Sequence, residues 1–284
     1  PHSSSAPGRR TSHRCSRAAL RRAMDCFRQA IDRDPGYALA YSGLADAYTL
    51  ASTGYYGEIP REESIANALP AATKALELAP TLAEAHASLG LIRHNQGDYA
   101  LAESALERAI ELNPNYTMAH VWHGLVLTSQ GRYREAAAHM RDAFRLDPLS
   151  PIINANVGFD ALRFDDVAEA EARFATAIEI DPAFQVPYSG MARLHAARGA
   201  PEEALRWIDQ AVARAPTRTF YLARRALVLA QLGRIDEAVA AIEAACCNPN
   251  GNRFEADLVV GLRVVTGNRT ALEAIADQEC SAWA

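Results

Sequence analysis

Histidines are the residues of this sequence whose spacing could support metal chemistry. His120 and His123 are three residues apart, so both could lie on one side of a helix, and His86 stands 34 residues before His120. A zinc site would need a third ligand and hydrogen-bonded partners that orient the imidazole rings. Glu84 and His139 are the candidates, but neither has a spacing that ties it to the pair. We therefore interpret these histidines as core or groove residues and expect no metal ion and no other cofactor.

The cysteines suggest little chemistry. Their number is odd, their spacing is irregular and no CxxC pair occurs: Cys15, Cys26, Cys246, Cys247 and Cys280. A disulfide framework or zinc site is disfavoured, and a reducing cytoplasm fits better. The adjacent Cys246 and Cys247 could form a redox or metal pair, but one packed and one exposed thiol at a helix end is the preferred interpretation.

Catalytic motifs are missing from the sequence. It contains no GxSxG, HExxH, Walker A or Rossmann glycine pattern. Three carboxylate pairs are expected at turns or helix starts, where they cap a helix or complement its dipole: Glu62–Glu63, Asp165–Asp166 and Glu202–Glu203. We predict no catalytic residue, and an enzyme without a recognisable nucleophile–base or metal constellation is the disfavoured alternative.

Prolines recur at a fixed interval along the chain. Five of them are spaced 34 residues apart: Pro80, Pro114, Pro148, Pro182 and Pro216. Proline cannot continue a helix interior, so a regular proline marks a regular helix end. Twelve, eight and five residues before each proline stand Ala, a mostly large apolar residue and Ala, and these offsets share one helix face. Each proline is therefore predicted to follow a helix that packs closely on its neighbours.

A second amphipathic segment precedes each of these helices, as in MAHVWHGLVLTS and VPYSGMARLHAA. Glycines inside such segments indicate tight helix contacts, because Gly costs about 1 kcal/mol against Ala in a helix: Gly43, Gly90, Gly124 and Gly158. Glycines between the two helices suit a helix C-cap: Gly97, Gly131, Gly199 and Gly233. Each unit is predicted to be helix–turn–helix–Pro.

A 34-residue helical unit with small, large, small and Pro positions resembles the tetratricopeptide repeat (TPR) family. The resemblance implies an all-α, right-handed superhelical solenoid. The family's first signature position carries no Trp here and holds Tyr41, His86, His120, Asn154, Tyr188 and Leu222. The Leu-Gly signature pair is complete only at Leu89–Gly90.

Three regions are predicted. Residues 1–18 form a basic arm or linker, and residues 19–250 hold a half repeat and about six units. Residues 251–284 form a degenerate capping helix pair. The first full unit carries an insertion at 51–61, where Tyr55 and Tyr56 could form an aromatic lip for a ligand, although a tolerated surface insertion is preferred.

Charge and hydropathy disfavour two classes of partner, nucleic acids and membranes. The net charge of −5 gives no reason to expect nucleic-acid binding, and no run approaches the roughly 20 apolar residues of a membrane helix. Residues 1–24 contain six arginines and no acidic residue. This end could contact phosphates or an acidic partner, but a solvated end or linker is preferred. The abundance of Arg and Ala and the single lysine, Lys74, suggest a GC-rich bacterial genome.

The TPR resemblance also implies a binding groove, lined by positions 2, 5, 9, 12 and 13 of each repeat. The residues expected there are Ser42, Asp46, Thr49, His94, Asn95, Thr128, Ser129, Phe159, Arg163 and Arg193. We expect an extended or helical peptide with apolar anchors and an acidic group near Arg163 and Arg193. The alternative is that both arginines only extend across a solvated face. The family's Lys and Asn clamp for chaperone carboxylates is absent from positions 5 and 9.

Two functions remain open. The first is a non-enzymatic scaffold for a protein or peptide of unknown identity. The second is a regulatory or sensor region of a larger regulator, because NYTMAHVWHGLVLTSQGRYREA and RLDPLSPIINANVGF look like TPR regions of bacterial winged-helix regulators, nucleotide cyclases or Ser/Thr kinases. The start at Pro1 instead of Met favours an excerpt or a processed chain, although no signature of those output domains is present. Self-association through a terminal repeat is a further expectation.

Overall fold

The computed structural model describes residues 17–52, 59–216 and 218–246. Within these ranges all regular structure is helical, in thirteen α-helices, which confirms the predicted all-α repeat fold. The helices are α1 (Arg17–Arg33), α2 (Ala38–Ala51), α3 (Arg61–Leu78), α4 (Ala83–Gln96), α5 (Tyr99–Leu112), α6 (Thr117–Ser129), α7 (Tyr133–Leu146), α8 (Pro151–Arg163), α9 (Val167–Ile180), α10 (Val186–Ala197), α11 (Pro201–Arg214), α12 (Thr219–Gln231) and α13 (Ile235–Cys246).

Several predicted features fall outside the described ranges. The basic arm does so except for its last two residues, where α1 begins, and the capping pair at 251–284 does so entirely. The insertion falls between the end of α2 at Ala51 and the start of α3 at Arg61, and its Tyr55 and Tyr56 are not among the described residues.

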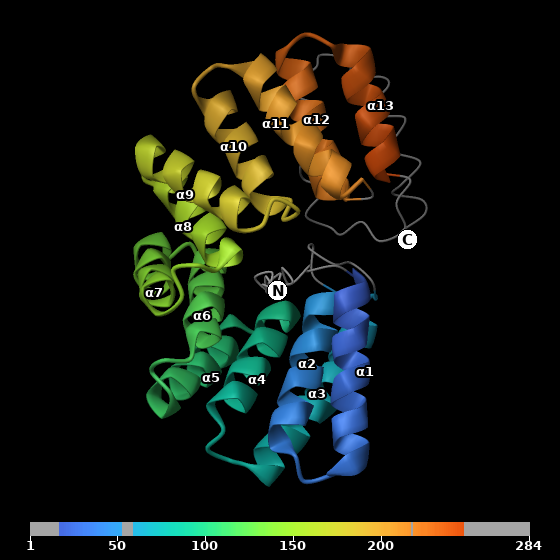
Figure 1. Cartoon of the computed structure of the whole chain (residues 1–284), viewed down its shortest axis with the longest axis vertical. Helices are drawn as coiled ribbons and strands as arrows, with labels where there is room; N and C mark the ends of the chain where they lie inside the picture. Colours follow the sequence, from blue (N-terminus) through green and yellow to red (C-terminus); the bar gives the residue numbers. More distant parts are fainter. Residues whose placement is uncertain (1–16, 53–58, 217, 247–284) are drawn as a thin grey trace, which may run out of the picture.

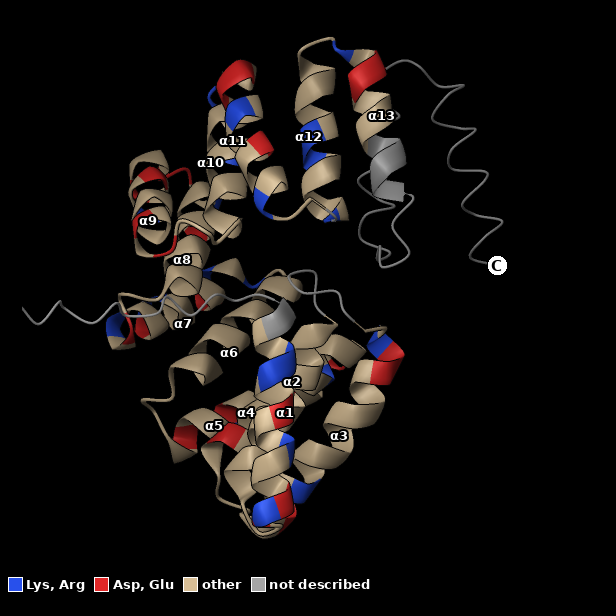
Figure 2. Ribbon diagram, turned by 45° about the vertical axis from the view of Figure 1, so that its right-hand side comes forward, with Lys and Arg blue, Asp and Glu red and all other residues tan. Residues whose placement is uncertain are grey.

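The helices follow one another along an arc (Figure 1). Each helix packs against the next one in the chain, and three pairs of even-numbered helices also touch: α2 and α4, α4 and α6, and α8 and α10. We call the even-numbered helices α2 to α12 the first helices and their partners α3 to α13 the second helices. Charge is spread unevenly over them: acidic residues gather on α5 and basic ones on α12 (Figure 2).

The second helices bury the small and large residues that precede each repeat proline. The alanines at offsets twelve and five are almost fully buried, as Ala102 and Ala109 of α5 illustrate. The residue between them, such as Leu106 or Phe174, is also fully buried. The predicted core face of these helices is thus confirmed.

Phe174 shows why glycines recur inside the first helices. A Cβ atom added to Gly158 of α8 would lie 2.7 Å from the Phe174 ring, and one added to Gly190 of α10 would lie 2.3 Å from it. The ring of α9 therefore occupies space that only two glycines leave open. The predicted tight contact of helices at Gly158 is confirmed.

The turns between first and second helices need a left-handed residue. Gly97, Gly131, Gly199 and Gly233 have φ values of 86°, 78°, 72° and 72°, which confirms the predicted glycine C-caps. The equivalent position after α8 holds Asp165 with φ 61°, the one non-glycine residue with positive φ in the described ranges.

A hydrogen bond replaces tryptophan at the first signature position of four repeats. The side chain at this position reaches the carbonyl oxygen of the proline six residues earlier, at 2.8 to 2.9 Å, in the pairs His86–Pro80, His120–Pro114, Asn154–Pro148 and Tyr188–Pro182. The polar side chain thereby fixes the loop that enters each first helix, which is why histidine, asparagine and tyrosine all fit there.

Candidate functional site

The surface of the first helices is the candidate binding site, and we call it the inner groove. Two of its predicted residues are buried instead. Ser42 is 1% exposed, and its hydroxyl lies 2.8 Å from the hydroxyl of Ser88 on α4. Thr49 is equally buried and donates a hydrogen bond to the carbonyl of Ala45. Both side chains are short and buried, so they do not reach a partner: Ser42 links α2 to α4, and Thr49 bonds within α2.

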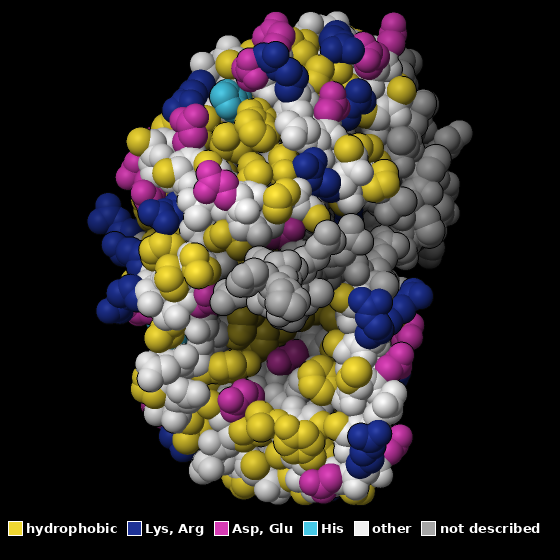
Figure 3. Space-filling view, in the orientation of Figure 1, with side chains coloured by type: hydrophobic (Ala, Val, Ile, Leu, Met, Phe, Trp, Pro, Cys, Tyr) yellow, Lys and Arg dark blue, Asp and Glu magenta, His cyan; other side chains and the backbone are white. Residues whose placement is uncertain are grey.

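The end of the inner groove nearest α2 is acidic. Asp46 is half-buried, and its Oδ1 atom has no hydrogen-bond partner among the described residues. Burial and, to a lesser extent, the charge of Glu84 raise the pKa of Asp46 to about 7. A hydrogen bond from Ser88 acts in the opposite direction and lowers this pKa. Burial and the charges of Asp46 and Glu84 also raise the pKa of Tyr116. In Figure 3 this half of the molecule is hollowed, with apolar side chains around the hollow and acidic ones inside it.

Polar residues at the ends of α4 and α6 form one rim of the groove. His94 Nε2 lies 2.9 Å from Ser129 Oγ, and burial lowers the pKa of His94. Asn95 approaches the carbonyl of Thr49 at 3.5 Å, and Thr128 is half-buried. The structure thus brings the predicted residues His94 and Ser129 together.

The other end of the groove is aromatic and basic. The Phe159 ring packs against Phe174 with ring centroids 5.0 Å apart, and the Arg193 guanidinium lies over Phe159 at 5.4 Å. Arg163 differs from Arg193 because it already forms an ion pair with Asp160 at 2.7 Å and lies over the Tyr133 ring.

Arg224 of α12 belongs to this basic end and was missed from the sequence. Its guanidinium lies over the Phe220 ring at 4.7 Å, and its Nε atom is buried with no hydrogen-bond partner in the described ranges. Burial, followed by the charge of Arg193, lowers the pKa of Arg224 to about 10. Burial and the charge of Arg163 lower the pKa of Arg193 as well. Arg224 occupies position 6, outside the groove positions of the family, but its charge within an otherwise apolar segment, FYLARRALVLA, was a usable signal.

Neither Arg193 nor Arg224 forms an ion pair with a described carboxylate. Besides burial, the pKa of each is lowered by another arginine on the adjacent first helix, Arg163 for Arg193 and Arg193 for Arg224. Arg224 is half-buried, and a cation taken from water without a counter-ion is costly, so this end of the groove favours an anionic group of a ligand.

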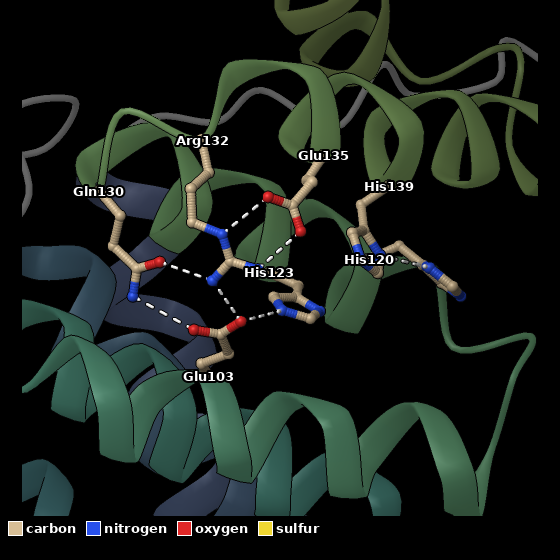
Figure 4. Close-up of polar contacts among 7 residues, drawn as sticks. All are labelled: Glu103, His120, His123, Gln130, Arg132, Glu135 and His139. Atoms are coloured by element: carbon tan, nitrogen blue, oxygen red, sulfur yellow. Dashed lines mark hydrogen bonds and ion pairs between the residues drawn. The ribbon is translucent and has the colours of Figure 1, made fainter.

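The residues proposed for metal chemistry separate into two groups. His120 and His123 of α6 are buried and meet His139 of α7, whereas His86 lies on α4 and is bonded to Pro80. Glu84 lies by Asp46 and not by these rings. Figure 4 shows the three histidines beside a network of polar side chains centred on Arg132.

The carboxylate pairs and cysteines add no site. Glu62–Glu63 and Glu202–Glu203 lie in the first turns of α3 and α11, and Asp166 caps α9 by accepting from the Glu169 amide, as the helix-start prediction required. Cys26 is exposed and free, and Cys15, Cys247 and Cys280 lie outside the described residues.

None of the described helices combines the length and the apolar character that crossing a bilayer requires.

Sequence models of the tetratricopeptide repeat match most of the described chain. The matched residues are 61–117, 95–151, 121–183, 161–227 and 221–246. No curated protein matches the chain significantly in sequence.

Solved structures share its fold at low identity. The human IFIT1 dimer with PPP-AAAA is 16% identical with a TM-score of 0.72, over 92% of this chain and 62% of that one. The Cut9–Hcn1 hetero-tetramer of APC/C is 15% identical with a TM-score of 0.67, over 85% of this chain and 47% of that one. TTC0263, a thermophilic TPR protein of Thermus thermophilus, is 18% identical with a TM-score of 0.57, over 64% of this chain and 98% of that one. The chain thus spans about half the length of the Cut9–Hcn1 chain, and these likenesses concern the fold alone.

Proposed function

The chain belongs to the tetratricopeptide-repeat family, and from this premise we propose that it is a non-enzymatic scaffold that binds a segment of another protein in its inner groove. The observation that carries the proposal is a pair of arginines on neighbouring first helices, the exposed Arg193 and the half-buried Arg224, neither of which forms an ion pair with a described carboxylate. Such cations gain most from a carboxylate that a partner brings.

Aromatic rings beside the two arginines supply apolar contacts for the same ligand. Phe159 lies under Arg193 and Phe220 lies under Arg224, so each guanidinium is stacked on one face and free to donate in its plane. An acidic residue flanked by apolar side chains of the bound segment would meet both kinds of contact. The ligand chemistry is therefore an acidic group with apolar anchors.

The opposite end of the groove argues for a peptide over a polyanion. Asp46 and Glu84 lie close enough for the charge of Glu84 to raise the pKa of Asp46. A nucleic acid would place phosphates against these carboxylates along an extended site, whereas a peptide can carry its acidic group at one end only. Although the IFIT1 structure includes PPP-AAAA, the acidic end of this groove disfavours such a ligand here.

The test is selection of peptides from a random display library on the purified chain. We expect sequences that combine Asp or Glu with apolar residues, and at least a tenfold loss of affinity in the Arg193→Ala/Arg224→Ala double variant. The matched control is Arg108→Ala/Arg206→Ala, which removes the same charge from exposed positions on second helices. Equal affinity of the two double variants, or selection of sequences without acidic residues, contradicts the proposal.

The regulatory or sensor role in a larger regulator stays a second prediction. It uses the same groove but places the output in another region of the polypeptide. An immunoblot of source cells with antibody to this chain separates the two: a band near 30.8 kDa favours an independent scaffold, and a much larger band favours the regulatory region.

A further inference from the structure

Three histidines meet where α6 packs on α7, and we call His120, His123, His139 and the nearby Asp142 the histidine cluster. The rings of His120 and His139 have centroids 5.7 Å apart, and those of His123 and His139 are 4.1 Å apart. One ligand atom from each of His120, His139 and Asp142 lies within 4.8 Å of the other two. His139 and Asp142 are three residues apart on α7 and so share a helix face.

The hydrogen bond from His120 to Pro114 fixes which nitrogen of His120 is available. Its Nε2 atom lies 2.9 Å from the Pro114 carbonyl oxygen, which can only accept, so Nε2 carries the proton. The Nδ1 atom of His120 then presents a lone pair, 3.5 Å from Nδ1 of His139. A backbone carbonyl that orients the remote nitrogen in this way is the usual support of a metal-binding histidine.

The separation of the two Nδ1 atoms suits a shared ion. Ligands about 2.0–2.1 Å from a tetrahedral zinc ion are roughly 3.3 Å from one another. The 3.5 Å between the two histidines is close to that value, so the rings need little movement to bind one ion. Among the described residues the ion-pair partner of Asp142 is Arg145, whose side chain is largely exposed, so the carboxylate can turn to the ion at small cost.

His123 provides independent evidence that these histidines do more than fill space between α6 and α7. It is 4% exposed and neither ring nitrogen has a hydrogen-bond partner among the described residues. The equivalent residues of three other repeats are apolar: Leu89, Val157 and Met191. A polar ring therefore stands where three other repeats place an apolar residue.

A neighbouring group of possible ligands is already committed to other partners. Glu103, Glu107 and His123 also lie close together, but Glu103 accepts hydrogen bonds from Arg132 at 2.6 Å and from Gln130 at 3.2 Å (Figure 4). Binding an ion there would break this network, whereas the His120, His139 and Asp142 group gives up only the exposed Arg145 pair.

We propose that His120 Nδ1, His139 Nδ1 and the Asp142 carboxylate bind one divalent transition-metal ion of the zinc or cobalt type, with water completing the coordination. Imidazole nitrogens with one carboxylate match the preferences of such ions over Mg²⁺ or Ca²⁺. The ion would link α6 to α7 on the side away from the inner groove. This site is separate from the proposed peptide-binding function.

His120→Asn is the decisive variant. Asn154 makes the same hydrogen bond to Pro148 one repeat later, so asparagine keeps the link to Pro114 while removing the metal-binding nitrogen. His86→Asn is the matched control, because His86 has the same bond to Pro80 and no described histidine within ring contact. The measurements are calorimetric titration of the EDTA-treated chain with Zn²⁺, and visible absorption with Co²⁺, whose intensity reports tetrahedral nitrogen and oxygen ligation.

We expect one Zn²⁺ per chain in the unchanged protein and in His86→Asn, and at least tenfold weaker binding in His120→Asn and His139→Gln. Zn²⁺ should also raise the Tm of the first two proteins and not of the last two. Failure of the unchanged chain to bind, or equal binding by His120→Asn, overturns the proposal. Loss of binding in His123→Asn with full binding in His120→Asn overturns it in favour of the Glu103 group.

Discussion

The Nε2 atom of His120 lies 2.9 Å from the carbonyl oxygen of Pro114, and this contact links the two levels of the structure. It is one of four equivalent hydrogen bonds that fix the entry to a first helix. It also sets the tautomer of His120, whose other ring nitrogen, Nδ1, faces Nδ1 of His139. A structural hydrogen bond that recurs along the solenoid thus leaves His120 Nδ1 available for the proposed metal ion.

The hydrogen bond from Asn154 to the loop before α8 predicts that substitutions at this position destabilise the protein by different amounts. This side chain is fully buried and donates to the carbonyls of Pro148 and Ser150. Asn154→Ala should lower the free energy of unfolding by about 1–3 kcal/mol, because the buried side chain makes two hydrogen bonds and each contributes about 0.5–1.5 kcal/mol. Asn154→His should cost less, since histidine makes this bond in two other repeats. Urea denaturation measures both, and equal losses would contradict the assigned role.

Gly190 is predicted to tolerate no side chain while Phe174 is present. Its added Cβ would lie 2.3 Å from the ring, so Gly190→Ala should destabilise the protein by about 1–3 kcal/mol through overpacking. Combining it with Phe174→Leu should give a loss smaller than the sum of the two single losses, because the smaller side chain vacates that space. Chemical denaturation of the three variants tests this, and strict additivity would refute the steric explanation.

Asp165 is predicted to be a site where glycine stabilises the protein. Its φ of 61° is the conformation that four glycines adopt at equivalent turns. A left-handed residue with a Cβ costs about 1–2 kcal/mol, and asparagine and aspartate less. Asp165→Gly should therefore raise the free energy of unfolding by up to about 1 kcal/mol, and the reverse change, Gly131→Asp, should lower it. Thermal denaturation that showed no gain for Asp165→Gly would mean that the aspartate side chain compensates its own strain.

The fold was predictable because the residues that define the repeat have strong effects on local backbone structure and burial. Prolines end helices, glycines adopt the left-handed turn, and alanines at fixed offsets bury one face, so each is visible without knowing its neighbours. Ser42 and Thr49 were expected in the groove but are buried, because the exposure of a short side chain depends on how neighbouring helices pack, which repeat position alone does not specify. Arg224 was missed for the same reason.

The histidine cluster could not be predicted from the spacing of its residues in the sequence. His139 was a candidate ligand, yet no spacing tied it to His120, because they lie on antiparallel neighbours joined by a turn. Only the packing of α6 on α7 brings the two Nδ1 atoms together.

The last prediction concerns the pH dependence of stability at Asp46. Its pKa is about 7 in the folded chain, raised mainly by burial, against an ordinary value near 3.9 for an unfolded carboxyl. Between these values the folded state binds a proton that the unfolded state does not, so the contribution of Asp46 is most favourable below pH ~4 and is lost as pH rises through about 7. Glu84, Ser88 and Tyr116 are the polar and titratable groups that face it.

Asp46→Asn removes this titration. Relative to the unchanged protein, the variant should gain on the order of 1 kcal/mol of unfolding free energy between about pH 5 and about pH 8. Asp32→Asn, at an exposed position on α1, is the control and should show no such gain. Urea denaturation at both pH values is the measurement. A difference between Asp46→Asn and the unchanged protein that stays constant with pH would mean that Asp46 is already ionised throughout, and that the acidic end of the inner groove carries its full charge at neutral pH.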